Sequence, residues 1–143
     1  MVEEKNKEVE RRVFEELNKG NWSAIDDLFA PDYVYHGPAG MEARGPDGFK
    51  QLMTTMKAAF PDFTMTVHDV MAEGDMVAAR ATYSGTHTGD FMGIPPTGKR
   101  FSMPAQVMVR FENGREVEAW GIGDMLGMLQ QLGIVPAMSM PGK

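Results

Sequence analysis

The segment AWGIGDMLGMLQQLG, residues 119–133, places one carboxylate between a tryptophan-bearing strand and an apolar helical pattern. An acid just before a helix commonly accepts a hydrogen bond from a free helical N–H, so Asp124 is expected to cap this helix. Glycines on both sides of Ile122 also suit a sharp bend at a cavity rim, with Trp120 as an apolar wall. Asp124 is therefore a candidate helix cap and a candidate general acid/base, and one carboxylate can do both because its two oxygens can have different partners.

A carboxylate of this kind can remove a proton from a carbon flanked by carbonyls without a metal. Hydrogen-bond donors must then stabilise the enolate oxygen. The same group, once protonated, can return the proton to a new alkoxide. Apolar surroundings would favour its protonated form and helix amides its charged form, so the sequence leaves this balance open.

Three histidines lie elsewhere in the chain. His87 ends a predicted strand on the face that carries Val77 and Tyr83, so it is either a donor or proton shuttle in the cavity or a structural histidine. His36 follows YVY in a loop rich in Gly and Pro, and either a pocket mouth or an exposed turn fits it. His68 alternates with threonines and is expected at the surface. Because the three are scattered, we expect no metal site.

Charged and apolar residues on the later strands complete the candidate site. Glu118 shares a strand face with Trp120, and it is either a second pocket carboxylate or a solvated strand residue. Arg80 would bind an anionic group, pair with an acid or lie at a subunit interface. Trp120, like Tyr33 and Tyr35, is of a type usually found in the core. The residues predicted to bind substrate are His36, Arg80, Met108, Glu118 and Trp120.

Hydrophobic periodicity predicts helices first and strands afterwards. Residues 3–19 form an amphipathic pattern with a stripe of Val9, Val13, Phe14 and Leu17, and their charged residues are expected on the solvated face. A short helix starts near Ser23, and a third follows Pro46. Period-two patterns then predict strands from Phe63, over 76–88, over 100–111 and over 116–122, with a last helix over 124–132. Hairpin signals such as Asn113-Gly114 predict an antiparallel meander, and hence an α+β fold with helices on one face of a curved sheet that encloses a cavity.

The bulk numbers fit one soluble domain over residues 1–143, with an irregular tail over 134–143. A net charge of −6 disfavours nucleic acid and anionic membranes as partners. The chain has no cysteine, no signal-peptide pattern and no apolar run near the roughly 20 residues of a membrane span, so a cytoplasmic location is expected. The 14 methionines either fill the core or line an adaptable apolar cavity.

Two stretches, YSGTHTGDFMGIPPTGKRF (83–101) and VEAWGIGDMLGMLQQLG (117–133), resemble the SnoaL-like polyketide cyclase family of the nuclear transport factor 2-like superfamily. The resemblance covers nearly the whole chain and implies a cone-shaped α+β fold. It also implies a cofactor-independent aldol cyclisation of a polyketide ester, with Asp124 at the position of the family's acid/base aspartate. His36 matches a polar pocket residue loosely, while Arg80, Trp120 and the segment 85–89 fit the usual pattern. A homodimer through the uncovered sheet face is implied as well.

Two rival functions share this fold. A limonene-type epoxide hydrolase would need two acids bridged by an arginine, for which Asp124, Glu118 and Arg80 are the available residues. The strand face assigned to Arg80 disfavours that arrangement. A non-catalytic binder of apolar small molecules would keep the cavity and tolerate Asp124→Asn with little loss of affinity.

Overall fold

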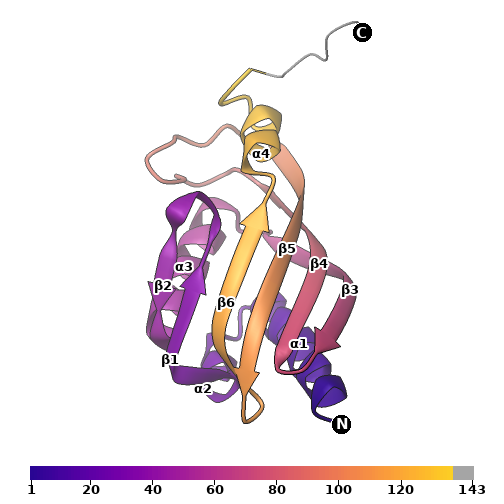
Figure 1. The fold of residues 1–143 in the computed structure, drawn as a ribbon. Helices are drawn as coiled ribbons and strands as arrows, with labels where there is room; N and C mark the ends of the chain where they lie inside the picture. The colour runs from indigo at the N-terminus through magenta and orange to yellow at the C-terminus, as the bar shows by residue number, and fades with distance from the viewer. Residues whose placement is uncertain (137–143) are drawn as a thin grey trace, which may run out of the picture.

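A curved six-stranded sheet frames the protein, which we describe for residues 1–136 from a computed structural model (Figure 1). The strands are β1 (Phe29–His36), β2 (Glu42–Arg44), β3 (Thr64–Glu73), β4 (Met76–Thr86), β5 (Arg100–Glu112) and β6 (Arg115–Gly123). The helices are α1 (Val2–Lys19), α2 (Ile25–Leu28), α3 (Gly45–Ala59) and α4 (Met125–Gln131), with short 3-10 turns at Trp22–Ala24 and Pro38–Gly40. The α+β class is therefore confirmed.

The strand order is β2-β1-β6-β5-β4-β3. Strands β3 to β6 form the predicted antiparallel meander, and its last hairpin turns at Asn113 and Gly114, which both have positive φ. The expectation of a wholly antiparallel sheet is wrong at one place, because β1 pairs parallel with β6. The sequence patterns gave no sign of β1 or β2. The register of β1 shifts between Phe29 and Val34, around Pro31, which has no N–H to donate to a ladder.

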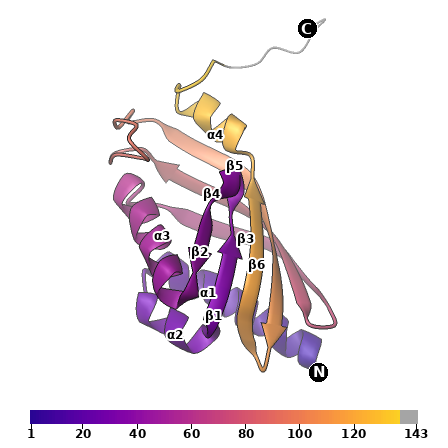
Figure 2. The same ribbon diagram turned by 60° about the vertical axis from the view of Figure 1, so that its left-hand side comes forward.

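Helices α1, α2 and α3 lie on one side of the sheet, and α4 lies at one end of β6 (Figure 2). Helix α1 packs on β3 and ends at Gly20, which adopts the left-handed conformation with φ 74° and confirms the predicted stop. Helix α3 packs on β1. The space between these helices and the sheet holds the core.

The inner stripe of α1 contains two polar residues as well as the predicted apolar ones. Val13, Phe14 and Leu17 are buried as expected. Asn6 and Glu10 are buried too, because positions 6, 10, 13, 14 and 17 share one helical face. The expectation that the charged residues of α1 all face solvent is therefore wrong at Glu10.

Among the helices of residues 1–136, none has the length and apolar character that a membrane crossing requires. The predicted irregular tail over 134–143 falls mostly on residues 137–143, which lie outside the described part of the chain.

Candidate functional site

An apolar cavity of about 110 Å³ lies between the sheet and the helices. Aliphatic, aromatic and thioether side chains make up nearly all of its wall. Half of the chain's 14 methionines line it: Met41, Met53, Met56, Met65, Met103, Met125 and Met128. Methionine therefore both fills the core and lines the cavity, since Met53 and Met128 belong to the core and border the cavity. Flexible thioethers can adapt this wall to ligands of different outline.

Two carboxylic acids lie in this apolar wall, Glu10 from α1 and Glu116 from β6. Each residue is only 2% exposed, and the two side chains are hydrogen-bonded to each other. No other residue of the described range, 1–136, donates a hydrogen bond to the buried Oε2 of either acid. Within that range, no lysine, arginine or histidine lines the cavity. The pair is therefore isolated from any cation in the cavity wall.

This isolation keeps protons on the pair. Burial raises the pKa of Glu10 from 4.5 to about 7, against a smaller lowering by the hydrogen bond from Glu116. Burial raises the pKa of Glu116 further, well above 4.5, and the charge of Glu10 and the hydrogen bond to it add to the effect. Glu116 is thus the acid and donor of the pair, and Glu10 is the member that ionises near neutral pH.

A β-bulge turns Glu116 inward. Arg110 pairs with Glu118, but the next residue of β5, Phe111, pairs with Glu116, so Val117 is an extra residue in β6. Strict alternation from Glu118 would have placed Glu116 on the outer face. With the bulge, both Glu116 and Val117 are buried.

Three tyrosines also line the cavity. Burial raises the pKa of Tyr35 to about 12 and moves the pKa values of Tyr33 and Tyr83 upward, with smaller contributions from nearby acidic groups in the last two cases. All three hydroxyls therefore stay protonated and can donate. Gly121 makes room for Tyr35, because a Cβ at that position would overlap the tyrosine ring and hydroxyl.

The structure confirms Asp124 as a helix cap. Its Oδ1 accepts a hydrogen bond of 2.9 Å from the N–H of Gly127. The residue is exposed and is not among those that line the cavity, although Met125 next to it is. Asp124 lies eight residues beyond Glu116, which corresponds to about 25 Å of extended strand. The two acids therefore sit near opposite ends of β6, and the acid/base role of Asp124 stays a prediction.

His87 lies on the predicted face but behind the cavity wall. Pairing of β4 with β5 is regular through Gly85, so no bulge changes its side. The ring is fully buried between Phe60 and Phe91, with centroid distances of 5.4 and 6.3 Å. Its Nδ1 accepts the backbone N–H of Thr97 at 3.2 Å, and its Nε2 has no partner. His87 is not among the lining residues, so its place fits the structural alternative.

The five residues predicted to bind substrate lie outside the cavity. Strand register puts Met108 beside Trp120 and Trp120 beside His36 on the outer sheet face. Trp120 is 41% exposed and stacks on His36 at 5.7 Å, so the expectation of a core tryptophan is wrong. Alternation explains this, because the neighbour of Trp120 that faces the cavity is Ala119.

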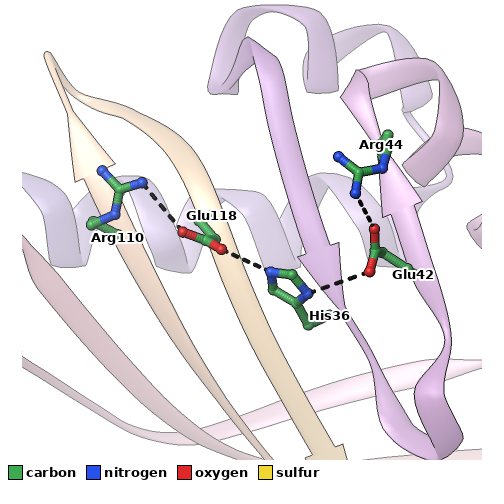
Figure 3. Close-up of polar contacts among 5 residues, drawn as sticks. All are labelled: His36, Glu42, Arg44, Arg110 and Glu118. Carbon is green, nitrogen blue, oxygen red and sulfur yellow. Dashed lines mark hydrogen bonds and ion pairs between the residues drawn. The ribbon is translucent and has the colours of Figure 1, made fainter.

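Figure 3 shows a chain of polar contacts on this outer face, formed by His36 and four residues with acidic or basic side chains. His36 Nε2 lies 2.8 Å from Glu118, and Arg110 contacts the other oxygen of Glu118 at 3.3 Å. Glu42 lies 3.8 Å from His36 Nδ1 and also pairs with Arg44. Glu118 is thus a solvated strand residue, one of the two alternatives that its sequence left open, and it is held by His36 and Arg110.

Arg80 pairs with Asp69 at 2.7 Å, and both side chains are more than half exposed. Pairing with an acid is one of the alternatives that the sequence left open for Arg80, beside the binding of an anionic group. His68 is exposed, as predicted, and contacts Thr82. The described residues bring no three metal-ligating side chains together. The arrangement that an epoxide hydrolase would need, with Arg80 between Asp124 and Glu118, is not formed.

Comparison with known proteins agrees with this architecture. The sequence model of the SnoaL-like polyketide cyclase family matches residues 7–132. The chain belongs to the SnoaL-like polyketide cyclase family. It is 32% identical over 122 residues to nogalonic acid methyl ester cyclase of Streptomyces nogalater. The aligned region covers 82% of this chain and 89% of that enzyme. It is 29% identical to aklanonic acid methyl ester cyclase of Streptomyces peucetius, over 86% and 87% of the two chains.

Solved structures show the same fold for this SnoaL-like chain. Wild-type IdmH of Streptomyces antibioticus is 38% identical, with a TM-score of 0.80 over 90% of this chain and 98% of IdmH. A SnoaL-like protein of Jannaschia, at 22% identity, has a TM-score of 0.86 over 94% and 96% of the two chains and supports the fold alone.

Sequence reasoning missed the carboxyl pair. Glu10 sits in the run KNKEVERR, which looks like a solvated helix face, and Glu116 is displaced by a bulge that has no sequence marker. One signal was available for Glu10, because it is four residues from Phe14 and three from Val13, on the apolar stripe. Tyr83 was recognised only as part of a strand face, and it also lines the cavity.

Proposed function

We propose that this SnoaL-like protein catalyses a cofactor-independent intramolecular aldol cyclisation of a polyketide ester or a related small carbonyl compound. The observation that carries the proposal is the apolar cavity, whose polar groups are carboxyls and tyrosine hydroxyls. Apolar walls with a few placed polar groups are typical of small-molecule sites. The named relatives that act on methyl esters of aklanonic and nogalonic acid give the class of substrate.

The reaction needs only proton transfer and carbon–carbon bond formation. A base removes a proton from the carbon between two carbonyls, and the enolate carbon attacks a second carbonyl of the same molecule. The new alkoxide then takes one proton, so the product is an isomer of the substrate. The hydroxyl of Tyr35, which lies against Gly121 three residues before Asp124, can donate to the enolate oxygen. No redox change occurs at any step.

Asp124 is the proposed acid/base for this step, on the strength of its motif. Supporting its place is Met125, the next residue, which borders the cavity together with Met128 of the same helix. The carboxylate has one oxygen on the Gly127 amide, so the other oxygen is available for a ligand at the α4 end. A proton-shuttle role for His87 would require the side chain of Phe91, which borders the cavity and cannot itself relay a proton, to move aside.

The test is turnover of aklanonic and nogalonic acid methyl esters, followed by liquid chromatography and mass spectrometry. A product of unchanged mass and new retention time is expected from the wild-type protein. D124N keeps a side-chain acceptor for the cap but cannot take a proton, so turnover is expected to fall by about 100-fold or more. D47N is the matched control, since Asp47 is an exposed acid in the first turn of α3. Tight binding without turnover would favour the non-catalytic binder.

The outer sheet face is the proposed homodimer surface. Met71 and Ile122 are each 69% exposed there, and Met108 and Trp120 add further apolar area. Exposed apolar groups on one sheet face are typical of a subunit interface. Light scattering on a sizing column is expected to give twice the chain mass, and I122E to give one chain mass. A monomeric wild-type protein would contradict this proposal.

A further inference from the structure

We propose that Glu10 and Glu116 form an acid/base site at the end of the cavity remote from α4, and that this site binds and enolises a ketone carbonyl. The inference rests on the proposed function only for the ligand class, a carbonyl compound. It names residues that the Asp124 motif does not include, and it places a reacting carbonyl about 25 Å along β6 from Asp124.

The first support is placement. Glu10 comes from the inner stripe of α1 and Glu116 from the bulge of β6, two elements far apart in sequence. Both are 2% exposed and both line the cavity. A bulge aimed at a cavity is a common device for re-directing a functional side chain. The fold thus holds two acids against one another where purely apolar packing would have been cheaper.

The second support is the unfilled hydrogen-bonding capacity. Glu10 Oε2 and Glu116 Oε2 are buried and accept no hydrogen bond from any other residue of the described part of the chain, so each has only the facing carboxyl or a ligand as a possible partner. Buried polar atoms of this kind are rare, because each unmade hydrogen bond costs free energy. A ligand in the cavity can supply the missing partners.

The chemistry of the surroundings selects a carbonyl oxygen. The other polar side chains of the lining are Tyr33, Tyr35 and Tyr83, whose hydroxyls can donate, and Tyr33 and Tyr83 lie near enough to the pair to feel its charge. The acid proton of Glu116 can turn from Glu10 to the oxygen of a ligand. A ketone oxygen accepts from such donors, whereas an ammonium group would hold both carboxyls ionised, which costs free energy in this apolar wall.

The proposed step conserves protons. The acid of Glu116 gives its proton to the ketone oxygen as Glu10 carboxylate takes the proton from the adjacent carbon. The carbon–hydrogen bond breaks, an oxygen–hydrogen bond forms, and the ketone becomes its enol. The pair again carries one proton, now on Glu10, and the hydrogen bond between the two carboxyls returns it. No cofactor or co-reactant is consumed.

The probe is 2-tetralone, a bicyclic ketone with an apolar body and one carbonyl. Proton NMR in heavy water follows exchange of its α-hydrogens for deuterium, which reports enolisation directly. The variants are E10Q, E116Q and the double variant, since glutamine keeps the size and a hydrogen bond but cannot transfer a proton. E8Q is the matched control, because Glu8 is an exposed residue of the same helix. Thermal melts and near-ultraviolet circular dichroism show which variants are folded.

We expect wild-type protein and E8Q to accelerate the exchange, and the double variant to lose the acceleration by a factor of about 100. Carbon-13 glutamate NMR gives a readout that needs no turnover: a carboxyl resonance that stays protonated at neutral pH is expected in wild type and absent in E116Q. Bound 2-tetralone is expected to shift that resonance.

Three results would overturn the proposal. The first is a folded double variant that exchanges the α-hydrogens as fast as wild-type protein, and the second is a wild-type rate no higher than the rate without protein. The third is that wild-type protein binds 2-aminotetralin and not 2-tetralone, and that E10Q and E116Q abolish this binding. Failure of the proposed function is a different result. Ester cyclisation could be absent while exchange still depends on the pair, and cyclisation could proceed while E10Q and E116Q have no effect on either reaction.

Discussion

The buried acid pair makes the stability of this protein depend on pH in a direction opposite to that of surface carboxylates. Glu116 keeps its proton in the folded chain, because its pKa lies well above 4.5. In the unfolded chain it loses that proton near pH 4.5. Between pH 4.5 and pH 7 the folded state therefore binds about one proton more at this residue. Stability due to Glu116 is complete below pH 4.5 and is lost progressively as the pH rises.

The size of this effect follows from the width of the pH window. One pKa unit corresponds to roughly 1.4 kcal/mol, so a difference of one proton over the window from pH 4.5 to about 7 corresponds to on the order of 3 kcal/mol. This is large beside a total stability of roughly 5–15 kcal/mol for a domain. Replacing Glu116 by Gln removes the titrating group and keeps a donor for Glu10. We expect E116Q to gain on the order of 3 kcal/mol over wild type between these two pH values.

The assay is urea unfolding followed by tryptophan fluorescence, over a pH series, for wild type, E116Q, E10Q and E8Q. The free energy of unfolding of each variant is compared with that of wild type at the same pH. This subtraction removes the contribution of surface groups that all variants share, such as Asp62 and Glu118, whose lowered pKa values favour the folded state above acid pH. For E10Q the gain is expected to stop near pH 7, where Glu10 ionises in the folded state. E8Q is expected to give no pH-dependent difference. Parallel curves for wild type and E116Q would refute the argument that this carboxyl is held protonated by burial.

Three further outcomes are expected. D124A is expected to cost about 1 kcal/mol in urea unfolding, because it removes the bond to Gly127, while D124N is expected to cost little; an unchanged stability of D124A would show that the cap does not matter. A119L puts a larger side chain on the cavity wall, so affinity for 2-tetralone in ligand-detected NMR is expected to fall tenfold or more, and unchanged affinity would place the ligand elsewhere. G121V has to displace the ring of Tyr35, so a loss of about 1–3 kcal/mol and a changed near-ultraviolet spectrum are expected; a silent substitution would contradict the close packing.

Local sequence signals determined the elements whose partners are close in the chain. The stripe of α1, the stop at Gly20 and the Asn113-Gly114 turn are each set by a few neighbouring residues, and each was predicted correctly. The Asp124 cap belongs to the same group, since its partner is only three residues away. The resemblance of residues 83–101 and 117–133 to the SnoaL-like family added the overall fold, because members of a family share their fold.

Contacts between distant segments decided the rest. Strand β1 exists because it pairs with β6, some 80 residues later, and no pattern within residues 29–36 announces that pairing. Distant contacts also decided which face of β6 turns inward. Trp120 and Glu118 share a face as predicted, but that face points away from the helices. Alternation along a strand fixes which residues go together and leaves the side to be chosen by packing.

The acid pair shows the same division at the site itself. The sequence alone determined an α+β architecture, an apolar interior rich in methionine and an acid that caps the last helix. Only the tertiary structure brought Glu10 of the first helix against Glu116 of the last strand, through a bulge that shifts one residue of register. The physical reason is that period and propensity act over a few residues, whereas burial, and with it the protonation of a carboxyl, depends on everything packed around the side chain.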